Sequence, residues 1–469
     1  MTSLPQAFLD FCHSHEVLRD LPEALTGTDP EVSVRVNSTK GVTPPSGAEL
    51  VPWNQAGFYL PDRPRFTFDP ALHQGLYYVQ DASSMAIGHV IRQLTSGRGP
   101  IVYADACAAP GGKTTASIDA LPEGSLVVAN EYDGKRAAAL CENIERWGSP
   151  NVMVRRGDTS AFASLPPMFD IIAADVPCSG EGMMRKEADA VTQWSPGLIR
   201  QCAALQREIV YNLWPALKPG GYLIYSTCTF NTAEDEENVR FIMEELGAEP
   251  VATGLTDFPG VVPALDSNVE AARFIPGRVR GEGLFIAVLR KSGGTEHGPT
   301  SFFSANQRRK GKSKAAPKSV DKALMAKAQS WIKDGFVLEA VGEDRLRALP
   351  AHWAETIHNL EERLGGIIFA GTDVATIKGR DLIPAHTLAL STALQPVFPT
   401  VELDYNQAIA FLRREPIVLS DSPRGLILLT YRNRPLGFVK NLGNRANTLL
   451  PPNRRILSPS LPDTPVQIL

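Results

Sequence analysis

Between about residue 76 and residue 292, short apolar runs alternate with longer segments whose apolar residues recur at helical spacing. The short runs predict strands at Ile101 to Ala104, Leu126 to Ala129, Val152 to Val154, Asp170 to Ala174 and Tyr222 to Ser226. The longer segments predict helices at Thr114 to Ala120, Asp133 to Trp147, Pro196 to Ala216 and Thr232 to Leu246. Strands and helices that alternate in this order predict an α/β fold, a doubly wound and mainly parallel sheet.

The regions on either side of this segment are patterned differently, and we expect separate domains there. Residues 1–75 combine helical spacing with a Pro-rich stretch, and within them Val32 to Asn37 alternates with the period of a strand. Residues 293–320 are rich in Gly, Ser, Lys and Pro and predict a linker. Two further modules are expected at 321–392 and 393–469, the second with a strand signal at Gly425 to Tyr431. A chain of 469 residues is too long for one hydrophobic core, which supports this division.

Composition and charge narrow the class of protein. The longest apolar runs, such as Leu284 to Leu289, are too short to cross a bilayer, and the first ten residues lack a signal-peptide pattern. The six cysteines have no paired spacing, which is typical of a reducing cytoplasm, and they offer no convincing metal site. We therefore expect a cytoplasmic protein, a monomer without a membrane partner or a metal. The net charge of −4 conceals a basic run at 308–318 and an acidic run at 234–237.

A glycine-containing turn, DACAAPGGKTT, follows the first predicted strand at residues 105–115. Gly111 and Gly112 allow a ligand to approach the backbone, and the helix that follows presents free N–H groups. The turn is not a P-loop, because Cys107 stands where that motif requires glycine, and the dinucleotide pattern GxGxxG is absent. A lone Gly-Gly pair would be explained as an ordinary strand-to-helix turn.

Acidic residues follow the next three predicted strands. Glu131 stands 19 residues after Gly112, the distance at which an acid can bind ribose hydroxyls in doubly wound folds. Asp158 follows the third strand and Asp175 ends the fourth. One such acid alone would be explained as a helix cap. Three of them beside a glycine turn favour a nucleoside that carries a cationic group, and S-adenosylmethionine is the cofactor that we expect.

Two cysteines follow what the pattern predicts to be neighbouring strands, Cys178 in DVPCSG and Cys228 in YSTCTF. Strand carboxyl ends face the ligand crevice in open α/β sheets, so both thiols would point into one crevice. A thiolate that adds to carbon 6 of a pyrimidine activates carbon 5 for methylation and can leave again afterwards. A cation such as Lys113 or Lys186 would lower the pKa of such a thiol. Asp175 is placed to bond the flipped base.

A single cysteine is more often a small buried hydrophobic residue than a nucleophile. That interpretation is the stronger one for Cys107, Cys141 and Cys202, of which the last two fall inside predicted helices.

Together these segments resemble the Nop/Sun family of RNA (cytosine-5) methyltransferases. The matching pieces are DACAAPGGKTT (105–115), Asn130-Glu131, Gly157-Asp158, DVPCSG (175–180), YSTCTF (225–230) with Glu236-Glu237-Asn238 after it, RVNSTK (35–40), QDASS (80–84) and GEGLF (281–285). The resemblance implies a Rossmann-like S-adenosylmethionine-dependent methyltransferase sheet, with Cys228 as the nucleophile and Cys178 assisting release of the methylated RNA. It also implies a cofactor site formed by Cys107, Ala108, Ala109, Pro110, Gly111, Gly112, Lys113, Glu131, Asp158 and Asp175.

The C-terminal third is similar to two modules of a bacterial branch of this family that methylates cytosine in small-subunit ribosomal RNA. The similar positions are Gly371, Pro384 to His386, Leu388, Leu436 to Lys440 and Pro451 to Arg455. The second module is PUA-like. The resemblance therefore implies ribosomal RNA as the partner, either free or within the small subunit, and an RNA-binding role for residues 1–75 and 393–469.

Two other functions compete with this one. A DNA cytosine-5 methyltransferase of the same fold would use Cys178 as its nucleophile, but the appended RNA-type modules and the additional cysteine at 228 argue against it. A non-catalytic RNA-binding or ribosome assembly protein on the same fold would have no need of both cysteines together with Lys113 and Asp175.

Overall fold

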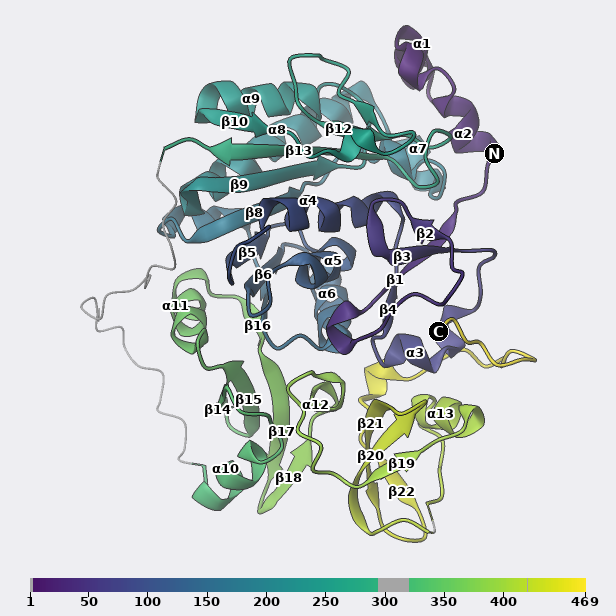
Figure 1. Ribbon diagram of the computed structural model, residues 1–469, viewed down its shortest axis with the longest axis vertical. Coiled ribbons are helices and arrows are strands. Elements are labelled where there is room, and N and C mark those ends of the chain that lie inside the picture. The colour runs from purple at the N-terminus through teal and green to yellow at the C-terminus, as the bar shows by residue number, and fades with distance from the viewer. Residues whose placement is uncertain (1–2, 294–319, 420) are drawn as a thin grey trace.

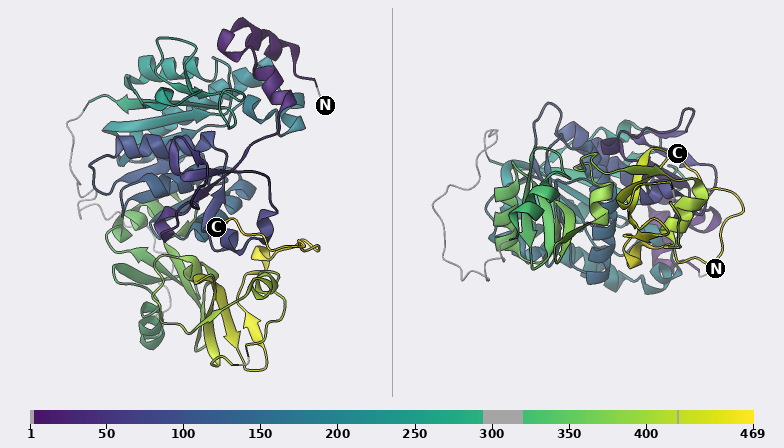
Figure 2. Two further views of the ribbon diagram at one scale, coloured as in Figure 1. Left: turned by 45° about the vertical axis from the view of Figure 1, so that its right-hand side comes forward. Right: turned by 90° about the horizontal axis from the view of Figure 1, so that it is seen from below.

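The computed structural model of the chain describes residues 3–293, 320–419 and 421–469. A large sheet forms its centre, with a small N-terminal sheet beside it and two small C-terminal sheets at one end (Figure 1). The first helices of the chain lie at the opposite end (Figure 2). Within the described ranges, no helix combines the length and the apolar character that crossing a membrane requires.

The predicted strands form the parallel part of the central sheet. They are β5 (Val102–Asp105), β6 (Leu126–Glu131), β7 (Val152–Arg156), β8 (Phe169–Asp175) and β9 (Leu217–Thr227). Parallel pairing joins β7 to β6, β6 to β5, β5 to β8 and β8 to β9. This order confirms the doubly wound α/β sheet. The winding reverses between β5 and β8, and the carboxyl ends of the strands there form the crevice in which such folds bind ligands.

Antiparallel strands extend the sheet at both edges. Beyond β9 lie β13 (Leu284–Lys291), β12 (Ala272–Phe274) and β11 (Val262–Pro263), and β10 (Ala248–Val251) also pairs with β13. Beyond β7 lies β16 (Ile367–Ala370), which comes from the segment that the sequence assigns to the first C-terminal module. That segment therefore covers an edge whose backbone N–H and C=O groups would otherwise be unpaired.

Apolar side chains that alternate along the strands build a core on each face of the sheet. Tyr103 of β5 packs in the cluster under α4 (Ala86–Leu94), α5 (Gly112–Ala120) and α6 (Gly134–Trp147). Its neighbours Val102 and Ala104 belong to the opposite cluster, under α8 (Pro196–Leu213), α9 (Glu236–Leu246) and α11 (Ala354–Leu364). A short helix, α7 (Ala188–Gln193), precedes α8. The four predicted helices are thus confirmed, with shifted ends.

The N-terminal region forms an antiparallel sheet in the order β2-β3-β1-β4. Its elements are α1 (Gln6–Ser14), α2 (Leu21–Gly27), β1 (Val32–Val36), β2 (Leu50–Val51), β3 (Asn54–Leu60), α3 (Pro70–His73) and β4 (Tyr77–Val79). β1 confirms the strand predicted from the alternation at 32–37.

Two four-stranded sheets make up most of the C-terminal third. The first sheet consists of β14 (Phe336–Val341), β15 (Arg345–Pro350), β17 (Thr372–Lys378) and β18 (Asp381–Pro384), and α10 (Lys322–Gln329) and α12 (His386–Leu390) flank it in sequence. The second sheet consists of β19 (Thr400–Glu402), β20 (Gly425–Tyr431), β21 (Arg434–Asn441) and β22 (Ala446–Thr448), and α13 (Tyr405–Leu412) lies between β19 and β20 in sequence. β20 spans the residues predicted for it.

Candidate active site

The turn between β5 and α5 lies at the carboxyl edge of the sheet. Gly111 has a φ of 106°, in the left-handed region that favours glycine, and it leads directly into α5. A Cβ added at Gly112 would come within 3.5 Å of the Tyr78 ring and 3.7 Å of the Gln80 amide. The two glycines thus place the free N–H groups of the first helical turn beside the crevice, where they can bind a carboxylate or another polar group.

Asp105, at the end of β5, stabilises this turn by a hydrogen bond to the start of α5. Its carboxyl is buried and accepts a hydrogen bond of 2.7 Å from the Thr114 hydroxyl. Burial raises the pKa of Asp105 to about 7. The sequence places Asp105 in the motif without indicating a function, because the role of Asp105 as a buried support depends on packing.

Glu131 and Asp158 stand at the ends of β6 and β7 and differ in environment. The buried Glu131 carboxylate accepts a hydrogen bond at Oε1 from the Asp133 N–H (3.0 Å). Its Oε2 has no hydrogen-bond partner among the described residues, although the Arg136 guanidinium lies 3.6 Å away. Asp158 is exposed and caps the 3-10 turn that follows, accepting from the Ser160 N–H (2.8 Å). Hydrogen bonding from the Ser160 side chain and N–H holds the pKa of Asp158 below the usual range. The free oxygen of Glu131 therefore fits the hydroxyls of a ribose.

The structure brings the two predicted cysteines together. The Cys178 and Cys228 Sγ atoms lie 3.2 Å apart, and both are free thiols. The contact arises because β8 and β9 are paired, Asp175 opposite Ser226, so that the loops that follow leave the sheet side by side. Both side chains are partly exposed at the crevice.

Lys113 and Asp175 form an ion pair beside the thiols. The Lys113 ammonium donates to Asp175 Oδ2 (2.8 Å), and Ser226 Oγ donates to the other carboxylate oxygen (2.7 Å). Burial alone would lower the pKa of Lys113, but the charges of Asp175, Cys228 and Asp81 outweigh it and raise the pKa. Lys186, the other cation considered from the sequence, pairs with Glu282 instead (3.0 Å).

The pKa of Cys178 is raised well above its ordinary value. The main cause is its hydrogen bond to Cys228, followed by burial and by the negative charges of Cys228 and Glu234. Since the thiolate is the nucleophilic form, a raised pKa makes Cys178 the weaker candidate for the attacking group.

Two N-terminal motifs pack against the same site. The buried Arg35 guanidinium pairs with Asp119 and donates to Gln80 Oε1 (2.8 Å) and Thr115 Oγ1 (2.6 Å). Asp81 accepts from the N–H of Glu282 (2.8 Å). The segments 35–40, 80–84 and 281–285 thus join α5 and the crevice, although they lie far apart in the sequence.

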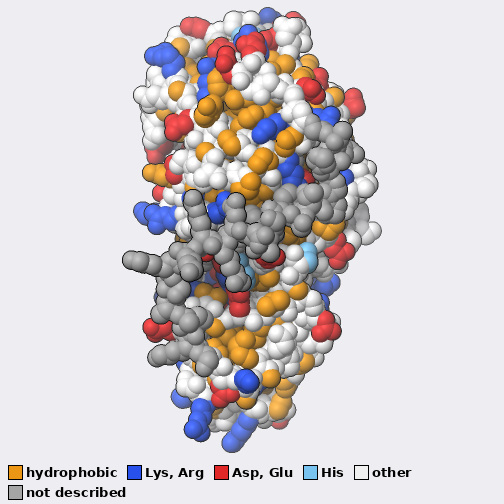
Figure 3. Space-filling view, turned by 90° about the vertical axis from the view of Figure 1, so that its left-hand side faces the viewer, with side chains coloured by type: hydrophobic (Ala, Val, Ile, Leu, Met, Phe, Trp, Pro, Cys, Tyr) orange, Lys and Arg blue, Asp and Glu red, His pale blue; other side chains and the backbone are white. Residues whose placement is uncertain are grey.

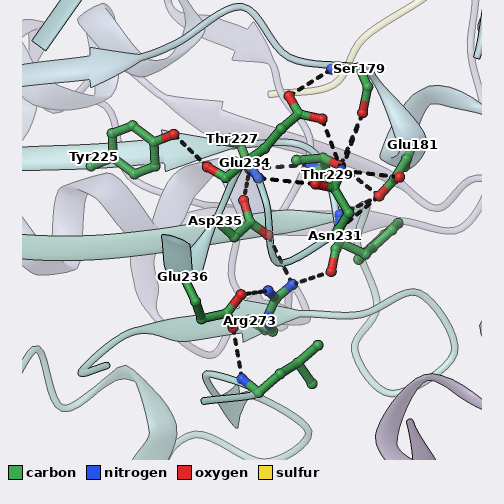
Figure 4. Close-up of polar contacts among 12 residues, drawn as sticks. Ser179, Glu181, Tyr225, Thr227, Thr229, Asn231, Glu234, Asp235, Glu236 and Arg273 are labelled. Atoms are coloured by element: carbon green, nitrogen blue, oxygen red, sulfur yellow. Dashed lines mark hydrogen bonds and ion pairs between the residues drawn. The ribbon is translucent and has the colours of Figure 1, made fainter. Parts of the chain in front are cut away.

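The acidic residues 234–236 are fully buried and lie together with Arg273 (Figure 4). Arg273 of β12, itself buried, pairs with Asp235 (3.0 Å) and Glu236 (2.6 Å). The sequence alone does not indicate a function for these acids. A signal was present, because Glu236 shares a three-residue spacing with Val239 and Ile242 on the inner face of α9.

The remaining cysteines and possible metal ligands add no second site. Burial raises the pKa of Cys107 in the turn, of Cys141 on α6 and of Cys202 on α8, which makes them poor nucleophiles. Within the described parts of the chain, no three His, Cys, Asp or Glu side chains come together as metal ligands would.

Three family models match this chain. Residues 99–290 match the 16S rRNA methyltransferase RsmB/F model, residues 4–82 match the N-terminal domain of 16S rRNA methyltransferase RsmF, and residues 398–456 match the methyltransferase RsmF PUA domain. The chain is 30% identical to ribosomal RNA small subunit methyltransferase F of Shewanella amazonensis, over 96% of this chain and 98% of the relative. It is 31% identical to the protein of that name from Escherichia coli O81, over 89% of each.

Solved structures share the fold over part of this chain. NSun6 from Pyrococcus horikoshii, determined with SFG, aligns with a TM-score of 0.51 and 19% identity, over 62% of this chain and 99% of that one. A methyltransferase homolog protein from the same organism aligns with a TM-score of 0.50 and 25% identity, over 61% and 95% of the two chains.

Proposed function

The chain belongs to the ribosomal RNA small subunit methyltransferase F family, S-adenosylmethionine-dependent RNA methyltransferases, and we propose that it methylates carbon 5 of cytosine through a covalent bond to Cys228. The observation that carries this proposal is the 3.2 Å contact between the Cys178 and Cys228 sulfurs at the crevice. Methylation at oxygen, or at an exocyclic nitrogen, needs no cysteine nucleophile, because those atoms carry lone pairs. Carbon 5 needs one, since a thiolate at carbon 6 is what makes carbon 5 nucleophilic.

The cofactor site fits S-adenosylmethionine, which supplies an electrophilic methyl group when bound. Residues 107–113 and the first turn of α5 would hold its polar end, and the free Glu131 oxygen would accept from its ribose hydroxyls. Asp158 is included in the site on the resemblance alone, with one of its oxygens already used as a cap.

The chain's own residues divide the reaction between them. Cys228 adds to carbon 6 as the thiolate, and Lys113, whose pKa is raised partly by Cys228, stabilises that negative charge. Asp175 is held by Lys113 and Ser226 and would bond the base. After methyl transfer the carbon 5 proton must leave before the bond between Cys228 and carbon 6 breaks. Cys178, in contact with the Cys228 sulfur, is placed to assist that elimination.

The substrate that the relatives' names support is small-subunit ribosomal RNA. We assign RNA binding to residues 1–75 and to the PUA-like module at 393–469, with the basic linker between 293 and 320 as a further contact. DNA methylation with Cys178 as nucleophile is disfavoured, because the family models that match the chain are those of a 16S rRNA methyltransferase and its PUA domain. A non-catalytic scaffold is disfavoured by the intact set of thiols, ion pair and free acid.

Methyl transfer from labelled S-adenosylmethionine to RNA and to DNA of matched sequence tests the proposal. We expect label in RNA only, recovered as 5-methylcytidine after digestion to nucleosides. Cys228→Ala should abolish transfer and leave cofactor binding within about twofold, because Cys228 attacks the base and does not hold the cofactor. Substantial turnover by Cys228→Ala would move the nucleophile to Cys178, and label in another nucleoside would refute the chemistry.

A further inference from the structure

We propose that two buried carboxylates, Glu181 and Glu234, are positioning residues that set the distance between the Cys178 and Cys228 thiols for methyl transfer. Glu181 follows Cys178 in its loop and Glu234 follows Cys228 in the other, and each reaches across to the opposite loop (Figure 4). Both side chains are fully buried. This inference deepens the cysteine mechanism proposed above and rests on it. We call the two crossed contacts the carboxylate clasp.

Glu181 holds the backbone that follows Cys228. Its Oε2 accepts from the Phe230 N–H (2.7 Å), the Asn231 N–H (3.0 Å) and the Thr229 hydroxyl (2.6 Å). Its Oε1 accepts from the Trp194 indole (2.9 Å). One carboxylate on the Cys178 side therefore binds three consecutive residues directly after Cys228.

Glu234 holds the backbone around Cys178 in return. Its Oε2 accepts from the Ser179 N–H (3.0 Å) and from the Gln206 amide (2.7 Å). The same Gln206 nitrogen donates to the Pro177 carbonyl (3.0 Å). Glu234 thus holds the residue after Cys178 directly, and it holds the residue before Cys178 through Gln206. Asn231 joins the two acids, since its amide donates to Glu181 (3.1 Å) and to Glu234 (2.9 Å).

A close backbone contact completes the clasp. The Gly182 N–H donates to the carbonyl of Cys228 itself (2.8 Å). A Cβ at Gly182 would lie 2.7 Å from that carbonyl oxygen, so only glycine allows the two loops to approach this closely.

The energetics explain why acids occupy these positions. A buried carboxylate is costly unless hydrogen bonds satisfy it, and hydrogen bonds to a charged acceptor are short and directional. Apolar side chains of similar size would fill the space but would not direct individual N–H groups. The clasp therefore trades stability for a defined geometry of the two thiols. A displacement of about 1 Å at a reacting group can cost about 100-fold in rate.

Glu181→Gln and Glu234→Gln test the clasp, because each keeps the shape of the side chain and places an N–H₂ group against N–H donors. Asp170→Asn is the matched control. Asp170 also accepts a backbone N–H bond, from Val102 (2.9 Å), but it lies at the opposite end of β8. All variants are compared with the full-length wild type, well below their unfolding temperatures.

The first measurement is the rate at which diamide oxidises Cys178 and Cys228 to a disulfide, followed by mass spectrometry as the loss of two hydrogen atoms. Diamide accepts both hydrogens and is reduced to the hydrazine, so no other reactant is needed. We call this disulfide formation trapping. The rate of trapping should fall by about 10-fold in both clasp variants and stay at the wild-type value in Asp170→Asn. This measurement needs no RNA, so it remains valid if the proposed methylation is wrong.

The second measurement is methyl transfer. Both clasp variants should lose about 10- to 100-fold in kcat, while the KM for S-adenosylmethionine stays within about twofold. Gly182→Ala should show the same loss with both acids present, because it displaces Cys228 directly. Wild-type trapping rates in the clasp variants would overturn the inference. Slow trapping with unchanged kcat would show that the clasp sets a distance that the reaction does not use, and would also overturn it.

Discussion

The edge of the sheet that carries the two thiols and the junction where the C-terminal modules meet the rest of the chain enclose ionisable side chains of different kinds. At the thiol edge they are mainly acids, among them the buried Glu181, Glu234 and Asp235. At the junction several are basic, among them the half-buried Lys40 and His386. The difference follows from which backbone groups each region leaves unpaired.

The junction is built around the end of α6. Carbonyl groups there have no helical partner, and three of them accept from other segments. The Lys40 ammonium donates to the Arg146 carbonyl (3.0 Å), the Asn37 amide to that of Trp147 (2.9 Å), and the Thr392 N–H to that of Gly148 (3.0 Å). Cations and N–H donors suit a helix carboxyl end, which carries partial negative charge.

The thiol edge presents the opposite polarity. The loops after β8 and β9 offer N–H groups at Ser179, Phe230 and Asn231, and carboxylates accept from them. At the thiol edge, carboxylate acceptors thus hold the loops that carry the two reacting groups. At the junction, cations and N–H donors join the C-terminal modules to the rest of the chain. The comparison predicts losses of rate from changes at the thiol edge and losses of stability from changes at the junction.

The largest expected effect concerns the cation at the thiol edge. Lys113→Met removes the positive charge beside Cys228 and breaks the ion pair of Asp175 with Lys113. We expect kcat/KM to fall by about 100-fold or more, because a charge placed to stabilise a reacting group contributes most of its effect in the transition state. Lys186→Met, at the cation that pairs with Glu282, should change it by less than about threefold. Equal losses would mean that the edge responds to any loss of positive charge.

At the junction, Arg454 pairs with Glu142 (3.3 Å) and with Glu145 on α6. Arg454→Met leaves the largely buried Glu145 carboxylate unpaired and should lower the free energy of unfolding by about 3 kcal/mol, measured in urea. Arg413→Met breaks an exposed pair with Glu415 in the same module and should cost less than about 1 kcal/mol. If Arg454→Met reduced kcat instead of stability, the separation of the two regions would fail.

The junction should also make stability depend on pH. Burial and nearby positive charge lower the pKa of His386 to about 3 and of His73 to about 4. Both residues line a cavity of about 180 Å³ between α6 and the PUA-like module. The unfolded chain binds protons near pH 6.5 and the folded chain does not, so stability falls as pH drops below 6.5.

By pH 5 this loss should reach about 2 kcal/mol for each histidine. His386→Gln should therefore flatten the decrease in unfolding temperature between pH 6.5 and pH 5 relative to the wild type. A slope that His386→Gln leaves unchanged would show that other groups determine the pH dependence.

The smallest effect is expected from the basic linker, which lies outside the described residues. On the face shown in Figure 3, the described basic and acidic side chains are interspersed. In the sequence, by contrast, five basic residues are concentrated within 308–314. Neutralising Arg308, Arg309, Lys310, Lys312 and Lys314 should raise the RNA dissociation constant and flatten its dependence on salt, with the target cytosine unchanged. An unchanged salt dependence would favour an inert tether.

The apolar runs predicted the parallel strands because they form the buried part of each strand. In β9 the prediction covered only the second half, since the first half contains Lys218, Pro219 and two glycines. The same local signal could not predict β16, since its pairing with β7 joins residues more than 200 positions apart. In sequence, the acidic residues 234–236 are typical of a solvated surface. They are buried because Arg273 and the loops after β8 and β9 provide partners for them, which only the tertiary structure reveals. The thiol contact was predictable because two adjacent strand ends determine it.

We propose that Cys228 forms the covalent bond to the RNA and that Cys178 assists its cleavage. The variant Cys178→Ala separates these two roles. Incubated with substrate RNA and S-adenosylmethionine, this variant should accumulate an RNA–protein adduct that survives denaturing electrophoresis. Peptide mapping should place the RNA on Cys228, and Cys178→Ala combined with Cys228→Ala should form none. Normal turnover without an adduct, or RNA attached to another residue, would contradict the account.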